Sequence, residues 1–226
     1  MRINKLLSNY GICSRTDTNR LIQENRIIVN DKLCVAGQWV VAEDIILIDN
    51  EIIQVKTKIY IALNKPVGIT CTAENSVESN IINFMNYPEY IFPVGRLDKS
   101  SQGLILMTND GDLSNKILES ENEHEKEYIV TVSKPFDEFF IKGMSEGVLL
   151  CKVKTRPCKV SRVSEDTFRI ILTQGLNKQI RKMSKNFGYT VVRLERIRIM
   201  NIKINGIDKG TWRHLTDEEI IELRNG

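Results

Sequence analysis

The densest group of chemically capable side chains lies in one short segment, Phe92 to Gly103, between two apolar stretches. In this segment Asp98 lies two residues after Arg96 and next to Lys99. Neighbouring cations favour the ionised form of a carboxyl group, so Asp98 would offer a carboxylate that can act as a nucleophile or a base near neutral pH. The alternative is an aspartate that only caps a turn beside Gly95, and composition alone favours that alternative because Asp and Gly are common turn residues.

Other reactive residue types are sparse. The chain has five cysteines, scattered without a CxxC pair, and two histidines, His124 and His214. This composition favours neither a disulfide framework nor a zinc site. No GxxxxGK(S/T), GxGxxG or HExxH motif occurs, so nothing points to a phosphate loop, a dinucleotide cofactor or zinc hydrolysis. We therefore expect no small-molecule cofactor and no metal, and we expect His124, among glutamates, to be exposed to solvent.

The charges are unevenly distributed. The 226 residues include 32 Lys and Arg against 29 Asp and Glu, a formal net charge of +3. Between Gly175 and Arg213, however, ten cations face only Glu195 and Asp208, and the first 34 residues are also basic. Two basic segments favour an anionic partner such as nucleic acid. The alternative, that these charges form solvated faces, is equally acceptable for the N-terminal segment alone.

No membrane segment is expected. No apolar run approaches the roughly 18 residues of a membrane span, and the start of the chain lacks the apolar core of a signal peptide. These features predict an intracellular, cytoplasmic protein. Nothing in the sequence requires an oligomer, so we expect a monomer.

The first 57 residues have the pattern of a small unit of their own. Ile3, Leu6, Leu7 and Tyr10 recur at helical spacing up to Gly11. Ser14, with Asp17 three residues later, predicts the start of a second helix. Short strand signals follow at 26–30 and 45–48, with turns at 30–32 and 49–50. We place a domain boundary near Thr57.

Residues 58–226 predict a mixed α+β domain whose sheet is mainly antiparallel. Strands are expected at 60–63, 103–108, 128–132, 168–173 and 189–200, and helices at 114–119, 137–144, 177–187 and from Thr216 onward, with Ile220, Ile221 and Leu223 packed inward. In the long stretch 189–200, neither alternating face is purely apolar. Either a bulge near Glu195 and Arg196 or an edge strand with one face exposed to solvent would explain this break in the alternation.

Two sets of motifs resemble known families. The string RINKLLSNYGICSRTDTNRLI followed by RIIVND resembles the S4 RNA-binding domain. A second set of motifs resembles the pseudouridine synthases of the RsuA, RluB, RluE and RluF family. It consists, in this order, of the blocks NKPVG, GRLDKSSQGLILMTNDGDL, EKEYIVTV and GLNKQIRKM. The residues of the later blocks are most similar to the RluF branch of this family. The resemblance spans essentially the whole chain. It implies isomerisation of uridine to pseudouridine in RNA, without a cofactor.

The resemblance also implies residue roles. Asp98 matches the catalytic aspartate, which either attacks C1′ of the nucleotide or removes a proton from C2′. Tyr128 matches the tyrosine that stacks on the target base, although a strand tyrosine in the core would fit the sequence as well. Arg181 matches the arginine that pairs with the aspartate, and Ile180 would form an apolar wall of the same pocket. Arg96 matches the residue that enters the space left by the flipped uridine or binds its phosphate.

The remaining candidates concern RNA binding. Lys65 belongs to the NKPVG block and is interpreted as structural more than catalytic. Lys178 and Lys182, with Lys185, recur at helical spacing and could contact RNA phosphates together. In the S4-like unit, Arg15 and Arg20 would face the RNA backbone. The expected partner is 23S ribosomal RNA or a pre-ribosomal particle. A tRNA stem-loop substrate, or a non-catalytic role in ribosome assembly, are the alternatives.

Overall fold

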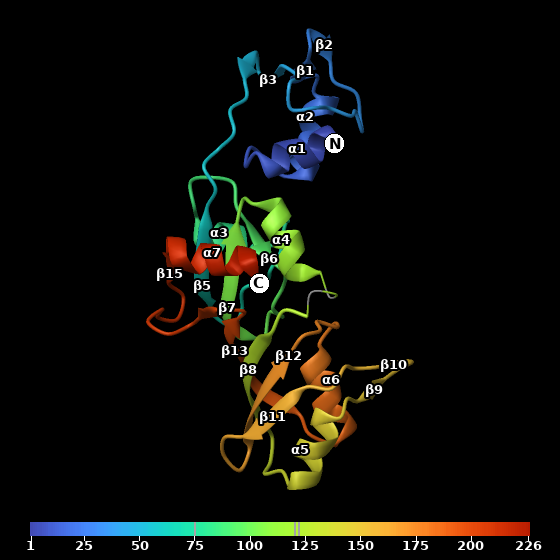
Figure 1. The fold of residues 1–226 in the computed structure, drawn as a ribbon, viewed down its shortest axis with the longest axis vertical. Helices are drawn as coiled ribbons and strands as arrows, with labels where there is room; N and C mark the ends of the chain where they lie inside the picture. Colours follow the sequence, from blue (N-terminus) through green and yellow to red (C-terminus); the bar gives the residue numbers. More distant parts are fainter. Residues whose placement is uncertain (75, 120, 122) are drawn as a thin grey trace.

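The computed structural model describes residues 1–74, 76–119, 121 and 123–226, and shows an elongated molecule with the N-terminal unit at one end (Figure 1). This unit contains helices α1 (Ile3–Asn9) and α2 (Arg15–Gln23). A four-stranded antiparallel sheet follows, in the order β2 (Lys32–Leu33), β1 (Ile27–Val29), β3 (Ile46–Ile48) and β4 (Glu51–Ile52). Helices α1 and α2 and strands β1 and β3 agree with the predicted elements, whereas the short strands β2 and β4, which follow the two predicted turns, were not predicted.

Local signals explain the elements of this unit. The Ser14 hydroxyl accepts a hydrogen bond from the backbone N–H of Asp17, as an N-cap does. The two hairpin turns hold Asn30 with Asp31, and Asp49 with Asn50, in the left-handed region, which Asn and Asp tolerate better than most residues. The buried residues form a core of their own, made by Ile3, Leu6, Leu7, Leu21, Ile22, Ile27, Val29, Cys34, Val40 and Ile46.

The N-terminal unit is joined to the rest of the chain through a short extended segment. The backbone N–H of Lys56 donates to Tyr10 O at 2.9 Å, and the Lys58 ammonium donates to Asn9 O. The Asn9 amide donates to both carboxylate oxygens of Asp112 at 3.2 Å. These polar contacts dock α1 against the neighbourhood of α4 (Gly111–Leu118).

The rest of the described chain is built on one nine-stranded sheet. Its main path runs β11 (Lys159–Arg162), β12 (Thr167–Leu172), β8 (Lys126–Val132), β13 (Val191–Ile199), β7 (Gln102–Thr108), β5 (Tyr60–Lys65) and β15 (Trp212–His214). Strand β6 (Phe92–Val94) also pairs with β7, and β14 (Ile202–Lys203) pairs with β13. Every pairing is antiparallel except that of β13 with β7. The mixed α+β fold with a mainly antiparallel sheet is therefore confirmed.

The long strand β13 is central in this sheet, between β8 and β7. The expectation of an edge strand is therefore wrong. Its pairing with β8 shifts register between Val191 and Arg193 and again between Arg196 and Arg198. The second irregularity directly follows Arg196, next to the predicted bulge. It lets Arg196 and Ile199 both be buried although strict alternation would place them on opposite faces.

Helices pack on the sheet through three apolar cores, one on one half of the sheet and two on the other. The β8–β11–β12 half packs against α5 (Glu138–Ser145) and α6 (Gln179–Asn186). The β5–β7 half packs α4 and α7 (Asp217–Asn225) on one core, and α3 (Ile81–Met85) on another. A small hairpin, β9 (Leu149–Leu150) and β10 (Val153–Lys154), extends from α5. Helix α7 begins with the predicted capping box of Thr216 and Glu219.

One detail of the expected packing of α7 differs. Ile221 of α7 is 58% exposed, whereas Leu223 is buried and Ile220 is half-buried. The reason is that α7 rests on the sheet through a narrow stripe, and Ile221 falls outside it.

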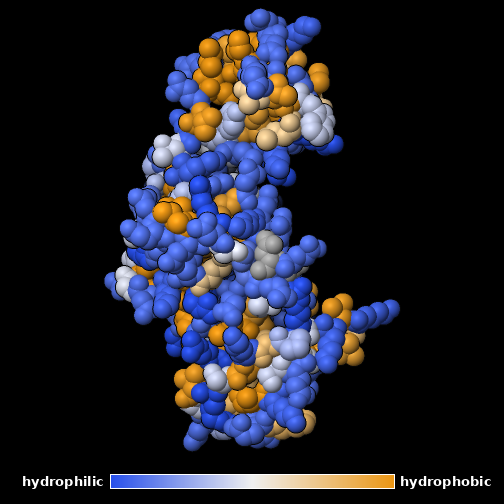
Figure 2. All heavy atoms as spheres, in the orientation of Figure 1, coloured by the Kyte–Doolittle hydropathy of each residue, from blue (hydrophilic) through white to orange (hydrophobic). Residues whose placement is uncertain are grey.

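Among the described residues, no helix is both long enough and apolar enough to cross a membrane. In the face drawn in Figure 2, hydrophilic side chains prevail over the middle of the molecule, and apolar ones gather at the N-terminal unit.

Candidate active site

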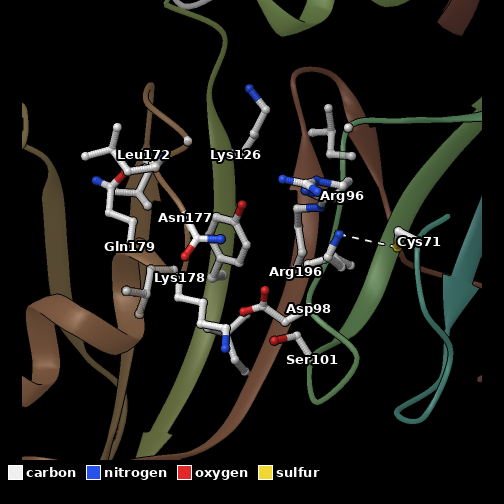
Figure 3. Close-up of a pocket in the computed structure, with 18 of the residues that line it drawn as sticks. Cys71, Arg96, Asp98, Ser101, Lys126, Leu172, Asn177, Lys178, Gln179 and Arg196 are labelled. Atoms are coloured by element: carbon white, nitrogen blue, oxygen red, sulfur yellow. Dashed lines mark hydrogen bonds between the residues drawn. The ribbon is translucent and has the colours of Figure 1, made fainter.

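A cavity of about 770 Å³ opens where the two halves of the sheet meet. Its walls come from the loop between β6 and β7, from β8 and β13, and from the segment that leads into α6. Asp98, Arg96 and Ser101 enter from the loop, while Asn177, Lys178 and Gln179 enter from the opposite side (Figure 3). The cavity therefore gathers side chains that are widely separated in the sequence.

The loop that carries Asp98 is held in place by hydrogen bonds of its backbone. The N–H of Ser101 donates to Asp98 O at 2.9 Å, which closes a turn around the aspartate. The N–H of Gly68 donates to Lys99 O at 2.8 Å, and the N–H of Leu97 points to Cys71 Sγ at 3.4 Å. Leu97 is buried below the loop. These contacts leave the Asp98 side chain 32% exposed, within reach of a ligand in the cavity.

Arg181 forms an ion pair with Asp98, as expected from the sequence. The distance from Arg181 Nε to Asp98 Oδ2 is 3.8 Å, too long for a hydrogen bond. The guanidinium is fixed from the other side, because Nη1 donates to Val191 O at 3.0 Å and Nη2 donates to Ser100 O at 3.2 Å and to Ser101 Oγ at 3.1 Å. Its buried Nε has no hydrogen-bond partner among the described residues. Arg181 thus presents an immobilised positive charge to the carboxylate.

Tyr128 of β8 lies at the junction of the two halves. It packs against the core of the β8–β12 half and against the α3 core. In the sheet it is paired with Ile170 of β12 and with Arg196 of β13. It also lines the cavity. The structure therefore brings Asp98, Tyr128 and Arg181 to one cavity, and the tyrosine belongs both to the site and to the core.

The other predicted residues fall into different places. Ile180 is buried and belongs both to the cavity wall and to the core behind it. Arg96 is exposed at the cavity. Lys178 also lines it, but precedes α6 in a left-handed conformation with φ of 52°, so it does not continue the helical row of Lys182 and Lys185. Lys182 lies outside the lining, exposed, with its ammonium 3.5 Å from Asn177 Oδ1.

Arg15 and Arg20 are remote from this cavity. Both are exposed residues of α2 in the N-terminal unit. Arg20 forms a surface ion pair with Asp17 at 3.1 Å. Arg15 lines a separate, smaller hollow of about 200 Å³ between the N-terminal unit and the α4 region. They offer positive charge at the end of the molecule farthest from the β9–β10 hairpin (Figure 1).

Lys65, a candidate for RNA binding by its place in the NKPVG block, is not placed to contact a ligand in the cavity. Its side chain is fully buried and does not line the cavity. The ammonium donates to Pro66 O and Ile69 O, both at 2.9 Å, and so ties the NKPVG turn to the end of β5. Burial lowers the pKa of Lys65. The structural interpretation of this lysine is the one that its contacts support.

The expectation for His124 is also wrong. The imidazole is 7% exposed, because the segment before β8 folds inward. Burial, and then the charge of Lys126, lower its pKa. A run of neighbouring glutamates in the sequence suggested a solvated loop, but the tertiary packing decides which side chain turns inward.

Two cavity residues were missed as site residues in the sequence. Arg196 of β13 is 3% exposed, its Nε donates to Leu104 O at 2.6 Å, and its Nη2 is buried without a partner among the described residues. Lys126 of β8 has a pKa lowered to about 8, mainly by burial and next by the charge of Arg196. A signal was present for both: Arg196 breaks the alternation of its strand, and Lys126 lies two residues before Tyr128 and so shares its face.

The electrostatics of the cavity favour an anionic ligand. Among its described lining residues Asp98 is the only carboxylate, whereas six cations line it: Arg96, Lys99, Lys126, Lys178, Arg181 and Arg196. An RNA strand supplies anionic phosphates for such a surface. Within the described part of the chain, no group of three or more His, Cys, Asp or Glu side chains is arranged to hold a metal ion.

Comparison with known proteins identifies the family. A family model described as RNA pseudouridylate synthase matches residues 59–186, more than half of the chain and all of the elements that build the cavity up to α6. The chain belongs to the RNA pseudouridylate synthase family. The synthases isomerise uridine by moving the C1′ bond from N1 to C5 of uracil, and the chain is an enzyme of this class.

Individual relatives extend the match over nearly the full chain. The Dual-specificity RNA pseudouridine synthase RluF of Escherichia coli is 49% identical over 226 residues, 99% of this chain and 78% of that synthase. The Ribosomal large subunit pseudouridine synthase B of Bacillus subtilis is 29% identical, with 99% and 95% covered. A crystal structure of a pseudouridylate synthase matches with a TM-score of 0.74, at 28% identity and 99% coverage of both chains. The similarity to the RluF branch is therefore confirmed.

Proposed function

We propose that this pseudouridine synthase acts on a uridine in structured 23S ribosomal RNA, free or in a pre-ribosomal particle. The observation that carries the proposal is the meeting of Asp98, Arg181 and Tyr128 in one cavity whose other charged lining residues are cations. The relatives named above support large-subunit RNA as the substrate. The dual-specificity name of the RluF relatives favours a second RNA substrate, and we propose a tRNA stem-loop for it.

We assign the steps of the reaction to the chain as follows. The target uridine flips out of its stack, at a cost of a few kcal/mol, and its base stacks on Tyr128. Arg96, exposed at the cavity, enters the vacated space or binds the phosphate of the flipped nucleotide. Asp98, oriented by Arg181, either attacks C1′ or removes the C2′ proton, and in both routes the C1′–N1 bond breaks and its electron pair leaves with the base. After the base has turned, C5 bonds to C1′ and the C5 proton leaves, for which Tyr128 is the candidate base.

We propose that residues 1–57 form an S4-like RNA-binding domain and residues 58–226 the catalytic domain. The separate core of the N-terminal unit supports this division. In this assignment Arg15 and Arg20 of α2 bind RNA phosphates at a distance from the target uridine, while Lys178 and Lys182 bind phosphates near the cavity. We propose a cytoplasmic monomer, in agreement with the expectation from the sequence.

Tritium release tests the catalytic assignment directly. Ribosomal RNA and tRNA transcripts carrying tritium at C5 of uridine lose the label only when C5 exchanges its proton for the bond to C1′. We expect release by the wild type and no detectable release by Asp98→Asn, with RNA affinity within about threefold. Asp208→Asn, an exposed residue outside the cavity lining, is the matched control. Normal release by Asp98→Asn would refute the role of Asp98, and release from only one RNA would fix the substrate class.

A further inference from the structure

Three cations occupy the wall of the cavity and the layer behind it: Arg196, which is buried, and Lys126, which is half-buried, line the cavity, and the buried Lys65 lies outside the lining. Burial, and then the charge of Arg196, lower the pKa of both lysines. None of the three forms an ion pair within 4 Å with a described carboxylate. Buried charges are normally paired, because an unpaired one loses its hydration without compensation. Among the described residues, backbone carbonyls accept hydrogen bonds from all three cations, and only Arg196 Nη2 is left without a partner, so the cluster has room for an anionic ligand at that atom.

Arg196 is the member of this cluster that is best placed to bind a ligand. Its Nε bond to Leu104 O fixes the guanidinium, and the unpartnered Nη2 leaves one buried donor unused next to the cavity that the residue lines. Arg196 is paired across the strands with Tyr128, so the two side chains share one face of the sheet. Lys126 lies two residues before Tyr128, lines the same cavity, and donates to His124 O at 3.3 Å.

We propose that Arg196, assisted by Lys126, binds a carbonyl oxygen of the flipped uracil and stabilises the negative charge that the base carries while it is detached from the sugar. This inference rests on the proposed function. When the C1′–N1 bond breaks, its electron pair stays with the base and spreads from N1 over O2 and O4. The charge disappears when an electron pair of the base forms the C5–C1′ bond. The C5 proton then leaves and N1 takes up a proton, so that the product base is neutral. A fixed guanidinium in a dry site stabilises such transient charge more than the neutral base.

The location favours the base over a phosphate as the anion. Arg196 is only 3% exposed and lies beside Tyr128, the residue assigned to stack on the uracil ring. Phosphates stay on the backbone at the mouth of the cavity, where the exposed Arg96, Lys99 and Lys178 can reach them. The deep and shallow cations therefore have different partners.

Single-turnover tritium release at saturating enzyme, measured with RNA affinity, tests the proposal. We expect Arg196→Met to lower the rate constant by at least a hundredfold while the Kd for the transcript changes less than threefold. Arg196→Lys, which keeps the charge, should have a rate constant at least tenfold higher than that of Arg196→Met. Arg193→Met, an exposed neighbour on the same strand, is the matched control. A wild type that releases tritium shows that the proposed function holds, whatever the variants do.

Equal losses in Arg196→Met and Arg196→Lys would refute the role of the charge and leave a structural one. A loss that appears in Kd and not in the rate constant would assign the cluster to a phosphate instead. If Arg196→Met does not fold, Lys126→Met decides: a rate constant lowered tenfold or more at unchanged Kd supports the proposal, and an unchanged rate constant overturns the part of Lys126. A wild type without release would refute the proposed function itself, and not this inference alone.

Discussion

The buried ammonium of Lys126 should make the native enzyme less stable than it could be. Its pKa is about 8 in the fold against an ordinary value of 10.5, so at pH 7 the fold binds this proton less well than the unfolded chain does. Each pKa unit corresponds to about 1.4 kcal/mol, which gives about 3 kcal/mol. Lys126→Met removes this cost and also the hydrogen bond to His124 O, worth about 1 kcal/mol. We therefore expect the variant to gain about 2 kcal/mol in free energy of unfolding at pH 7.

The sign of the pH dependence follows from the same numbers. Between pH 8 and pH 10.5 the unfolded chain keeps the Lys126 proton while the native state has lost it. Stability of the wild type, relative to the variant, must therefore rise with pH across this window. Above the upper value neither state is charged, and the advantage of Lys126→Met should disappear.

Urea unfolding at pH 7 and pH 10 measures both effects. The exposed Lys203→Met serves as the control and should stay within about 0.5 kcal/mol of the wild type at both values. A Lys126→Met variant that is no more stable at pH 7, or whose advantage is the same at pH 10, would refute the assignment of a desolvated ammonium. Combined with a slower reaction, a more stable variant would show that the cation is kept for function at the expense of stability.

Three further perturbations address the scaffold and the RNA contacts. Gly103 has φ of +104°, and a Cβ there would lie 2.3 Å from Arg196 O. Gly103→Ala should therefore cost at least about 2 kcal/mol in urea unfolding and slow tritium release, while Gly175→Ala, which has open space for the added Cβ, should leave the free energy of unfolding unchanged. Thr216→Ala removes the cap of α7 and should lower the free energy of unfolding by about 1 kcal/mol at unchanged activity. A smaller loss of stability than in the exposed control Thr190→Ala would contradict the role of the capping box. Lys178→Gln should reduce the slope of log affinity against log salt by about 1, whereas Lys142→Gln on α5 should leave it unchanged; equal slopes in both would exclude a phosphate contact of Lys178.

The elements that depend on neighbouring residues could be predicted from the sequence. The start of α2 at Ser14, the hairpin turns at 30–31 and 49–50 and the capping box of α7 are local, because each is decided by hydrogen bonds or dihedral angles within a few residues. The motifs also pointed to the loop of Asp98 and to Arg181 as its partner. The short strands β2, β4, β6, β9, β10, β11, β14 and β15 were missed, because short strands form only when a neighbouring strand supplies the pairing.

By itself, the sequence determined the family, the fold class and the residues that resemble its catalytic set, because these are written in contiguous motifs. Only the tertiary structure decided that β13 is central, that Lys65 is buried away from the ligand, and that Arg196 and Lys126 line the cavity. The parallel contact of Arg196 with Gly103 joins residues far apart in the chain. Burial and pairing of this kind depend on how distant segments pack, and no local pattern of residue types specifies them.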